Sequence, residues 1–427
     1  MLYYSIIVIF ILTYLLISMT NRINKALTVM IAACLVVFLN VVPFQELSLK
    51  IDLNVLFMLM GTMIIGDIVG QTGLFEWISI MIARHFKGNG LLTVLGILTA
   101  IAVSSAFYGN IVTLILFVPV AILLAQILNL PVRPFLVLLA LFANLGGSAT
   151  LIGDPCNVIV GSRAGVSFMQ FIIHVAPAAV IIGIFWLCLV AIFRGRCFVS
   201  GTGSKQQIMK ALPEKAITDF SLLRRALLVG ALILIALIVS SYTKSEPGVI
   251  LLFGAIVMGL VCRLKMRNVL QKVDWPSIIF VGSLFVIIGS LEMQGGFEDI
   301  ALWMKKYANG NMFVMAMLIL WGSAFFSSLV DNIPLAIALA PLVRKVSIDF
   351  PAELNAQHPL LWALVLGITL GGSISLLGSS GNYAMKRLAE RNKYHVSAFS
   401  FTAYGMPFAV SGLLIASIYL YIRYFMK

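Results

Sequence analysis

Long apolar runs constrain this chain more than any other feature of its sequence. Several reach about 17–20 residues, the length of helix that crosses a hydrocarbon core of about 30 Å. Examples are YYSIIVIFILTYLLISM, ALTVMIAACLVVFLNVV, LLVGALILIALIVSS and FAVSGLLIASIYLYI. Only helices and closed barrels satisfy their backbone inside lipid, and these runs are too continuous for barrel strands. The sequence therefore predicts an all-α polytopic membrane protein.

Composition and charge agree with a membrane protein. Of the 427 residues, 61% are hydrophobic and 11% are charged, whereas about 25% of a soluble domain is charged. The formal net charge of +13 does not indicate nucleic-acid binding, because Lys and Arg concentrate in the cytoplasmic loops of membrane proteins. The N-terminus lacks a basic region and a cleavage site, so residues 1–19 are predicted to be a retained span. We expect a multi-pass protein of the inner or plasma membrane.

The sequence gives no sign of an enzyme or of a cofactor. Its five cysteines are scattered, without the spacing of a disulfide framework or a metal site. The four histidines form no ligand cluster, and no nucleophile stands beside a base. The phosphate-binding motif GxxxxGK[ST] does not occur, so the chain itself is not expected to hydrolyse ATP.

The second half of the chain repeats polar motifs of the first half. KIDLN, which starts at Lys50, matches KVDWP at Lys272, and GNIVTLILFVP at Gly109 matches DNIPLAIALAP at Asp331. Further on, GGSATLIGDPCN matches GGSISLLGSSGN. Chance similarity between apolar stretches would not reproduce Gly, Asn and Pro in the same order. The sequence therefore predicts two homologous halves.

We place these halves at residues 1–195 and 224–427, joined by a basic cytoplasmic linker over 196–223. Each half is expected to cross the membrane five times, and an odd number inverts the second half relative to the first. Each half is also expected to contain an amphipathic segment at the interface and a re-entrant hairpin. In the first half the predicted spans are 2–18, 25–43, 53–71, an interrupted span at 134–165, and 177–194; the amphipathic segment is 74–86 and the hairpin arms are 91–107 and 111–128.

Polar residues interrupt the apolar helices twice in each half. The hairpin tips read SSAFYGNIVT and SSLVDNIP, and the breaks in the next helix read GDPCN and GSSGN. Such breaks can be packing devices, but four at matching positions are typical of secondary transporters, whose interrupted helices meet near the midplane. The candidate substrate-binding and ion-binding residues are Ser105, Gly109, Asn110, Thr113, Thr150, Gly153, Asp154, Asn157, Ser328, Asp331, Asn332, Ser373, Ser375, Gly378, Ser379 and Asn382.

Asp154 and Asp331 are the strongest single candidates. A carboxylate within a span costs about 2.5–3.5 kcal/mol on insertion scales and is functional by default. The repeat places Gly109 opposite Asp331 and Ser379 opposite Asp154, so each half contributes one carboxylate. Each could ligate a cation or carry a proton. Asp154 could also cap a half-helix, and the two roles can coexist.

Two further residues leave alternatives open. Asp67 lies in the apolar run MLMGTMIIGDIVG, and Gly289 stands at its repeat position. It could have a snorkelling or interhelical role, or act as a proton relay. Cys156 stands beside Asp154, where a thiol would meet a thiophilic substrate or serve as a small hydrophobic residue.

The segments ATLIGDPCNVIVGSRAGVSFMQFIIHVAP and SSLVDNIPLAIALAPLV resemble the arsenite permease, NhaD-type and P-protein branch of the ion transporter superfamily. That superfamily also holds citrate and dicarboxylate carriers. The resemblance implies a homodimer, two opposing hairpins in each chain and an elevator mechanism. It also implies ion and substrate sites at Gly109–Ile111 with Gly153–Asn157, and at Asp331–Ile333 with Gly378–Asn382.

Two positions depart from this family pattern. Gly109 stands where the family usually has Asp, and Cys156 stands where it has a second Pro. The missing carboxylate weighs against a cation antiporter and in favour of a neutral or anionic substrate, or of one ion site rather than two.

We therefore expect a secondary active transporter of a small inorganic ion or oxyanion, such as arsenite, coupled to H⁺ or Na⁺. A Na⁺/H⁺ antiporter of the NhaD type and an organic-anion carrier are the alternatives within this class. An ion channel that uses the same broken helices as a filter is the alternative from another class. Saturable exchange in proteoliposomes would distinguish a carrier from a channel.

Overall fold

The computed structural model describes residues 8–13, 24–39, 43–200, 208–209, 212–243, 245–271, 273–351 and 357–426. All regular elements in these ranges are helical, and eight helices are long and apolar enough to cross a membrane. The all-α polytopic prediction is confirmed. The elements of the first half are α2 (Lys25–Phe38), α3 (Phe44–Ser48), α4 (Leu53–Gly70), α5 (Leu74–His85), α6 (Gly90–Tyr108), α7 (Asn110–Ile127), α8 (Val132–Ser148), α9 (Pro155–Ala164) and α10 (Phe168–Arg194).

Two short 3₁₀ turns, η1 (Gly195–Cys197) and η2 (Pro213–Ala216), lie in the linker. The second half then follows the order of the first and ends in a short π-helix. Its elements are α12 (Phe220–Thr243), α13 (Pro247–Val261), α14 (Met266–Gln271), α15 (Trp275–Met293), α16 (Glu298–Ala308), α17 (Met312–Leu329), α18 (Asn332–Ser347), α20 (Pro359–Gly372), α21 (Ser380–Arg391), α22 (Ala398–Leu420) and η3 (Tyr421–Phe425).

Most predicted boundaries lie close to the observed ones, and one was wrong. The span expected over 177–194 begins earlier, at Phe168. Ser167 and Gln170 form a capping box there, and Pro177 is accommodated inside the helix. The span expected over 2–18 lies largely outside the described residues.

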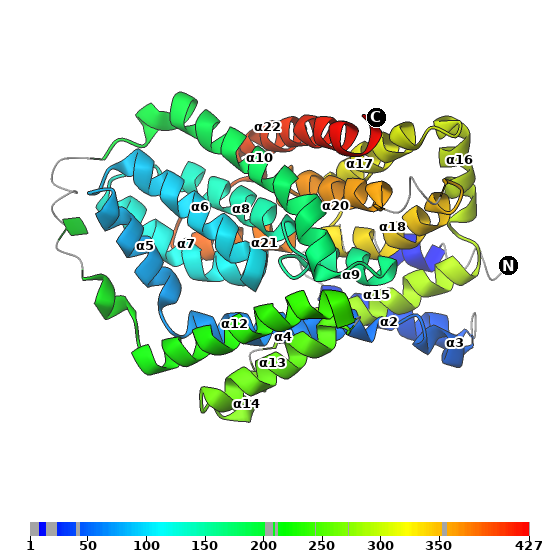
Figure 1. The fold of residues 1–427 in the computed structure, drawn as a ribbon, viewed down its shortest axis with the longest axis horizontal. Coiled ribbons are helices and arrows are strands. Elements are labelled where there is room, and N and C mark those ends of the chain that lie inside the picture. Colours follow the sequence, from blue (N-terminus) through cyan, green and yellow to red (C-terminus); the bar gives the residue numbers. More distant parts are fainter. Residues whose placement is uncertain are drawn as a thin grey trace.

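The helices lie mostly along the long axis of the molecule (Figure 1). The α5, α6 and α7 helices lie towards the end that carries the linker, whereas α16, α17 and α18 lie towards the opposite end. The arms of the two hairpins therefore extend towards opposite ends of the molecule. The broken helices α8–α9 and α20–α21 lie between them (Figure 1).

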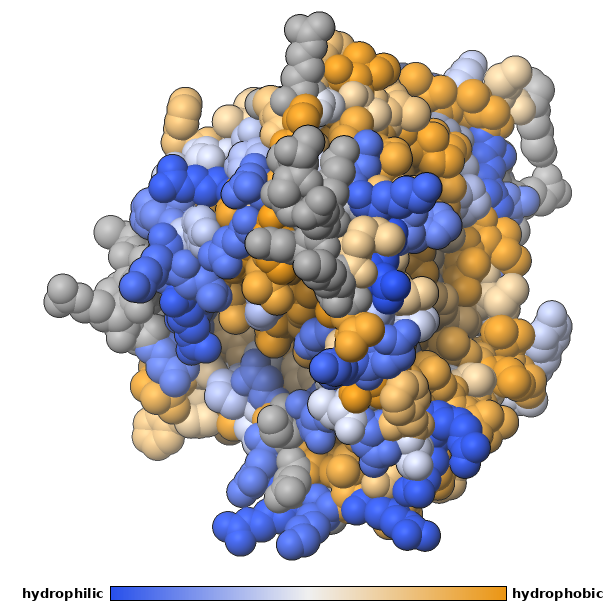
Figure 2. Space-filling view, turned by 90° about the vertical axis from the view of Figure 1, so that its left-hand side faces the viewer, coloured by the Kyte–Doolittle hydropathy of each residue, from blue (hydrophilic) through white to orange (hydrophobic). Residues whose placement is uncertain are grey.

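Hydrophilic and hydrophobic residues share the surface at the linker end of the bundle. Figure 2 looks onto this end, where hydrophilic residues gather at the left and along the bottom, and hydrophobic residues lie between them and towards the upper right. Along the side, Leu228, Leu232 and Ile235 of α12 remain 61%, 63% and 57% exposed. A hydrocarbon environment accepts such side chains, as expected for helices that face lipid.

The linker packs against the first half. The backbone N of Thr218 donates to Thr72 O at 3.1 Å, and its hydroxyl donates to Gln71 O at 2.7 Å. The hydroxyl of Ser200 donates to Gly88 O at 2.7 Å. These bonds hold the two ends of the linker to the turns that flank α5.

Close helix contacts position the broken helices against the hairpins. A Cβ at Gly146 of α8 would lie 2.0 Å from Ala102 O of α6. A Cβ at Gly371 of α20 would lie 2.2 Å from Ala324 O of α17. Small residues let helices approach in this way, and the same contact occurs once in each half.

We expect Gly146→Ala to lower the free energy of unfolding by about 1–3 kcal/mol, because the added methyl group would push α6 from α8. Gly322→Ala on α17 is the matched control, since a Cβ there meets no atom within 4 Å. Thermal unfolding of the detergent-solubilised protein measures both. Equal melting temperatures for the two variants would contradict the close packing at Gly146.

Candidate functional site

Four helices begin at the centre of the molecule. Their N-caps are Gly109 for α7, Asp154 for α9, Asp331 for α18 and Ser379 for α21. The α9 helix packs against α18, and α21 packs against α7, so helix starts from both halves meet. A helix N-terminus carries about half a positive charge. The centre therefore combines four positive dipole ends with two carboxylates.

One asparagine in each half satisfies the backbone freed by the break. The Asn157 side chain donates to Gly147 O at 2.9 Å and to Thr150 O at 2.7 Å. At the matching position, Asn382 donates to Gly372 O at 2.9 Å and to Ser375 O at 2.8 Å. Buried carbonyls need such partners, so both amides have a structural role.

Hydroxyl groups join each hairpin to its broken helix. In the first half, the Ser105 hydroxyl donates to Ala143 O at 2.6 Å and the Thr150 hydroxyl donates to Ala106 O. These bonds fix the end of α6 against α8.

The second half contains the same pair of bonds. The Ser327 hydroxyl donates to Ile368 O at 2.7 Å, and the Ser375 hydroxyl donates to Ser328 O at 2.7 Å. Ser327, which our candidates did not include, is the repeat counterpart of Ser105. The matching bonds show that the sequence repeat carries equivalent local contacts.

Other predicted hydroxyls lie differently. The hydroxyls of Ser328 and Ser373 donate to carbonyls of their own helices, Phe325 O at 2.7 Å and Thr369 O at 3.2 Å. Such bonds are local and do not join the two halves. The hydroxyl of Thr113, one turn after the tip of the first hairpin, is buried and has no partner among the described residues.

Asp154 links the two halves. Its Oδ1 accepts from the backbone N of Cys156 at 2.9 Å, which caps α9. Its Oδ2 accepts from the Asn110 side chain at 2.7 Å and from the Asn332 side chain at 3.5 Å. The residue is 1% exposed. One carboxylate thus caps its own helix and contacts both hairpin tips, so the capping alternative is correct and leaves one oxygen facing the tips.

Asn144 was missed by the sequence analysis. Its side-chain N donates to Asn382 Oδ1 at 2.8 Å. Its Oδ1 accepts from Asn110 and from the Ser379 hydroxyl, both at 3.3 Å. It is 2% exposed and sits inside α8. The available signal was a lone amide in the apolar run FLVLLALFANL, since polar residues within a span are expensive and functional.

Unsatisfied oxygens gather around this network. Within the ranges that the structure describes, the side-chain oxygens of Asn157, Asn332 and Thr113 are buried and have no hydrogen-bond partner. Leaving a buried acceptor unsatisfied costs about 1–3 kcal/mol. Hard cations such as Na⁺ take carboxylate and amide oxygens as ligands. These oxygens, together with Asp154, are therefore the groups best suited to hold a cation.

The two hairpin tips have different chemistry. Asp331 caps α18 by accepting from Ile333 N at 3.2 Å. Asp331 is more exposed than Asp154. The second tip therefore places an acidic residue, half-buried as a whole, beside the network.

The first tip has a backbone that suits glycine. Gly109 has φ +80° and ψ 150°, a region that is essentially restricted to glycine and costs other residues about 1–3 kcal/mol. The next residue, Asn110, donates its backbone N to Gly153 O at 3.2 Å. The local fold thus accounts for the glycine at this tip.

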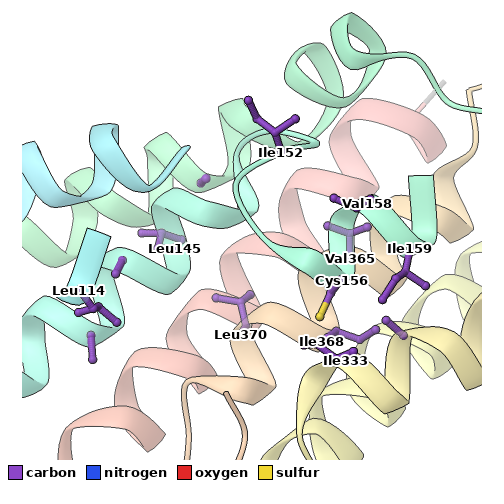
Figure 3. Close-up of a cluster of buried hydrophobic side chains, with 14 of the residues drawn as sticks. Leu114, Leu145, Ile152, Cys156, Val158, Ile159, Ile333, Val365, Ile368 and Leu370 are labelled. Carbon is purple, nitrogen blue, oxygen red and sulfur yellow. The ribbon is translucent and has the colours of Figure 1, made fainter. Parts of the chain in front are cut away.

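The remaining backbone candidate, Gly378, packs against the backbone of Gly372. Cys156 lies between apolar side chains and the Asp154 carboxylate. Figure 3 shows its sulfur directed towards Ile333 and Ile368, and the residue is 2% exposed, while its side chain also interacts with Asp154. The apolar side of this environment agrees with a small hydrophobic residue.

Asp67 lies apart from the network but lines a cavity that reaches it. This cavity of about 380 Å³ extends between α4 and the tip of the first hairpin. Gly109 and Asn110 line one part of it, and Asp67, Gln71 and Asp274 line another. Its size falls in the range of small-molecule sites.

Comparisons with known proteins give relatives along almost the whole chain. The model of a family described as "Citrate transporter" matches residues 14–367. An uncharacterized transporter of Mycobacterium bovis is 34% identical over 98% of this chain and 97% of its own length. A 46 kDa membrane protein of Mycobacterium leprae is 32% identical, covering 98% of each chain. The mouse P protein is 28% identical over 88% of this chain and 54% of its own length.

Removing the Asn144 amide tests the network. We expect Asn144→Ala to lower the free energy of unfolding by about 1–3 kcal/mol, because Asn382 Oδ1 loses its donor in a buried site. Ser148→Ala on the same helix is the control, since the Ser148 hydroxyl donates to Leu145 O of its own helix at 2.7 Å. Thermal unfolding in detergent measures the difference, and equal stability of the two variants would contradict the cross-half bond.

Proposed function

Because this chain belongs to the citrate transporter family of membrane transporters, we propose that it is a secondary active carrier that couples a small anion to Na⁺ or H⁺. The proposed substrates are oxygen-bearing anions, the class that includes the oxyanion arsenite and the organic anion citrate. The family membership points to a carrier rather than an enzyme, and we propose the plasma membrane as its location.

One observation carries this proposal: a single buried carboxylate, Asp154, contacts the hairpin tips of both halves, through Asn110 and Asn332. Four helix starts surround it, and their dipoles attract an anion. A carboxylate and unsatisfied oxygens at the same place attract a cation. Neither ion is stable alone in a low-dielectric site, so an anion and a cation that bind together balance each other's charge. This is the physical basis of coupling.

We propose an elevator mechanism with two inverted repeats. The helix pairs α4 with α13 and α2 with α15 would form the fixed scaffold, and the hairpins with the broken helices would form the moving domain. The matching hydrogen bonds of the two halves support an internal repeat, and the opposite directions of the hairpins in Figure 1 support its inversion. A homodimer is proposed from the resemblance.

A Na⁺/H⁺ antiporter is the second candidate. The carboxylates of Asp154 and Asp331, together with the unsatisfied oxygens, favour cation binding. However, Gly109 supplies no carboxylate at the first tip, and its backbone does not suit one. An anion carrier coupled to one cation site fits this asymmetry better.

Neutralising the carboxylates tests the proposal. We expect Asp154→Asn and Asp331→Asn to reduce cation-driven uptake at least about 100-fold, because removing a full charge partner from a buried site costs several kcal/mol. Asparagine still caps a helix well, so α9 and α18 should remain folded. Uptake of arsenite, citrate and related anions into proteoliposomes, with imposed Na⁺ or pH gradients, is the measurement.

Asp299→Asn is the control, because Asp299 lies exposed in the first turn of α16, away from the network. Saturable, gradient-dependent uptake that survives in the control and is lost in both site variants supports a carrier. Coupled uptake at the wild-type rate in Asp154→Asn would refute the proposal. Flux that does not saturate with substrate would indicate a channel.

A further inference from the structure

The two short helices that start at the centre, α21 and α9, have equivalent neighbours. The α21 helix packs against α7 and α8, and α9 packs against α18 and α20. The repeat matches Asn144 of α8 with Thr369 of α20. The carbonyls one residue earlier, Ala143 O and Ile368 O, each accept from a hairpin serine, which confirms this match. The surroundings of α21 and α9 can therefore be compared residue by residue.

Around α21, the Asn144 amide joins the polar groups. Its side-chain N donates to Asn382 Oδ1 at 2.8 Å. Its Oδ1 accepts from the Asn110 side chain and from the Ser379 hydroxyl, both at 3.3 Å. An amide side chain can donate and accept at the same time. The buried oxygen of Asn382 therefore has a donor.

Around α9, this donor is missing, because Thr369 is shorter and carries no amide. The side-chain oxygens of Asn157 and Asn332 are buried and have no hydrogen-bond partner in the part of the chain that the structure describes. The two residues are 1% and 4% exposed. The nitrogen of the Asn332 amide lies 3.5 Å from Asp154 Oδ2. Two unpartnered acceptors, at the positions that match Asn382 and Asn110, thus lie near a carboxylate.

Cys156 takes up part of the space that the shorter Thr369 leaves. A Cβ at the residue that matches Cys156, Gly381, would lie 3.6 Å from Asn144 Oδ1. The repeat therefore places the Cys156 side chain beside Thr369. A thiol is a weak hydrogen-bond donor, and this one interacts with Asp154. The thiol fills space but leaves the two amide oxygens without a partner.

We propose that Na⁺ binds beside Thr369, at the place that the amide nitrogen of Asn144 takes around α21. Its ligands are the side-chain oxygens of Asn157, Asn332 and Asp154. This inference rests on the proposed function, since it names the coupling cation and its place. The site joins the helix break of the first half to the hairpin tip of the second, whereas the family resemblance pairs each tip with the break of its own half.

The chemistry of the ligands favours Na⁺ over a proton or a divalent cation. A proton on Asp154 would give one hydrogen-bond donor, whereas a hard cation binds several oxygens at once. Asp154 contributes one negative charge, which a monovalent cation balances, and an unbalanced charge in a buried site is costly. Around α21, the amide of Asn144 serves in place of the cation, so this arrangement provides one Na⁺ site rather than two.

Rebuilding the surroundings of α21 around α9 tests the site. In the double variant Thr369→Asn with Cys156→Gly, the new amide has the room that Gly381 gives Asn144, and it can donate to Asn157 Oδ1. Na⁺ should raise the melting temperature of the wild type in detergent above its value in choline, because a ligand of the folded state stabilises it. We expect the double variant to need at least about tenfold more Na⁺ for the same rise, since each factor of ten corresponds to the loss of about 1.4 kcal/mol of binding.

Cys156→Gly alone is the matched control, because it removes none of the three ligands and should keep the Na⁺ response. A wild-type response in the double variant would overturn the site, and loss of the response in the control alone would overturn this set of ligands. If the double variant does not fold, Asp154→Asn takes its place, because asparagine keeps the cap of α9. Asp154→Asn should lose the Na⁺ response, and an unchanged response would also overturn the site.

This measurement separates the site from the proposed function, because it does not depend on transport. If Na⁺ stabilises the wild type and not the double variant, the site stands even where no tested anion is transported, and only the proposed function fails. If a pH gradient alone drives uptake and Na⁺ does not stabilise the wild type, the site is refuted and the carrier stands.

Discussion

The structure depends on satisfying a backbone that is broken inside an apolar interior. A helix that ends there exposes carbonyl and amide groups to surroundings that offer no water. Asn157 and Asn382 each bind two of the freed carbonyls, and Asp154 and Ser379 cap the helices that follow. Most polar atoms at the centre are hydrogen-bonded in this way. The few that have no partner among the described residues are the groups of the proposed ligand site.

The sequence predicted the breaks and tips because their residues have a local cause. Gly, Asp, Pro and Asn favour the starts and ends of helices. Breaks at matching positions of the two halves, and a carboxylate inside an apolar span, singled out Asn157 and Asp154. Contacts between the halves depend on the tertiary fold, and no local sequence pattern indicates them. Asn144 lies within the regular helix α8 and neither starts nor ends a helix. Nothing around it in the sequence therefore pointed to its contact with Asn382. Asp67 was noticed, but its cavity exists only because α4 and α7 pack together.

The two halves are alike in framework and different in chemistry. Equivalent hydroxyls and amides fix both broken helices, yet Asn144 has Thr369 at its repeat position, and Asp331 has Gly109. The two hairpin tips therefore differ around one carboxylate that both contact. The first half supplies this carboxylate, Asp154, and a glycine tip at Gly109, whereas the second half supplies an acidic tip at Asp331.

The α9 helix connects this centre to the far side of the molecule. Beyond Asp154, its last turn carries Ser162, whose hydroxyl donates to Asp52, and Arg163, which donates to Lys50 O and faces Glu292. These partners belong to the proposed scaffold side. The ten-residue α9 helix therefore joins the carboxylate of the proposed ion site to these contacts with Asp52, Lys50 and Glu292. Under the proposed elevator mechanism, movement of α9 across the membrane requires these contacts to break first, so they stabilise the described conformation.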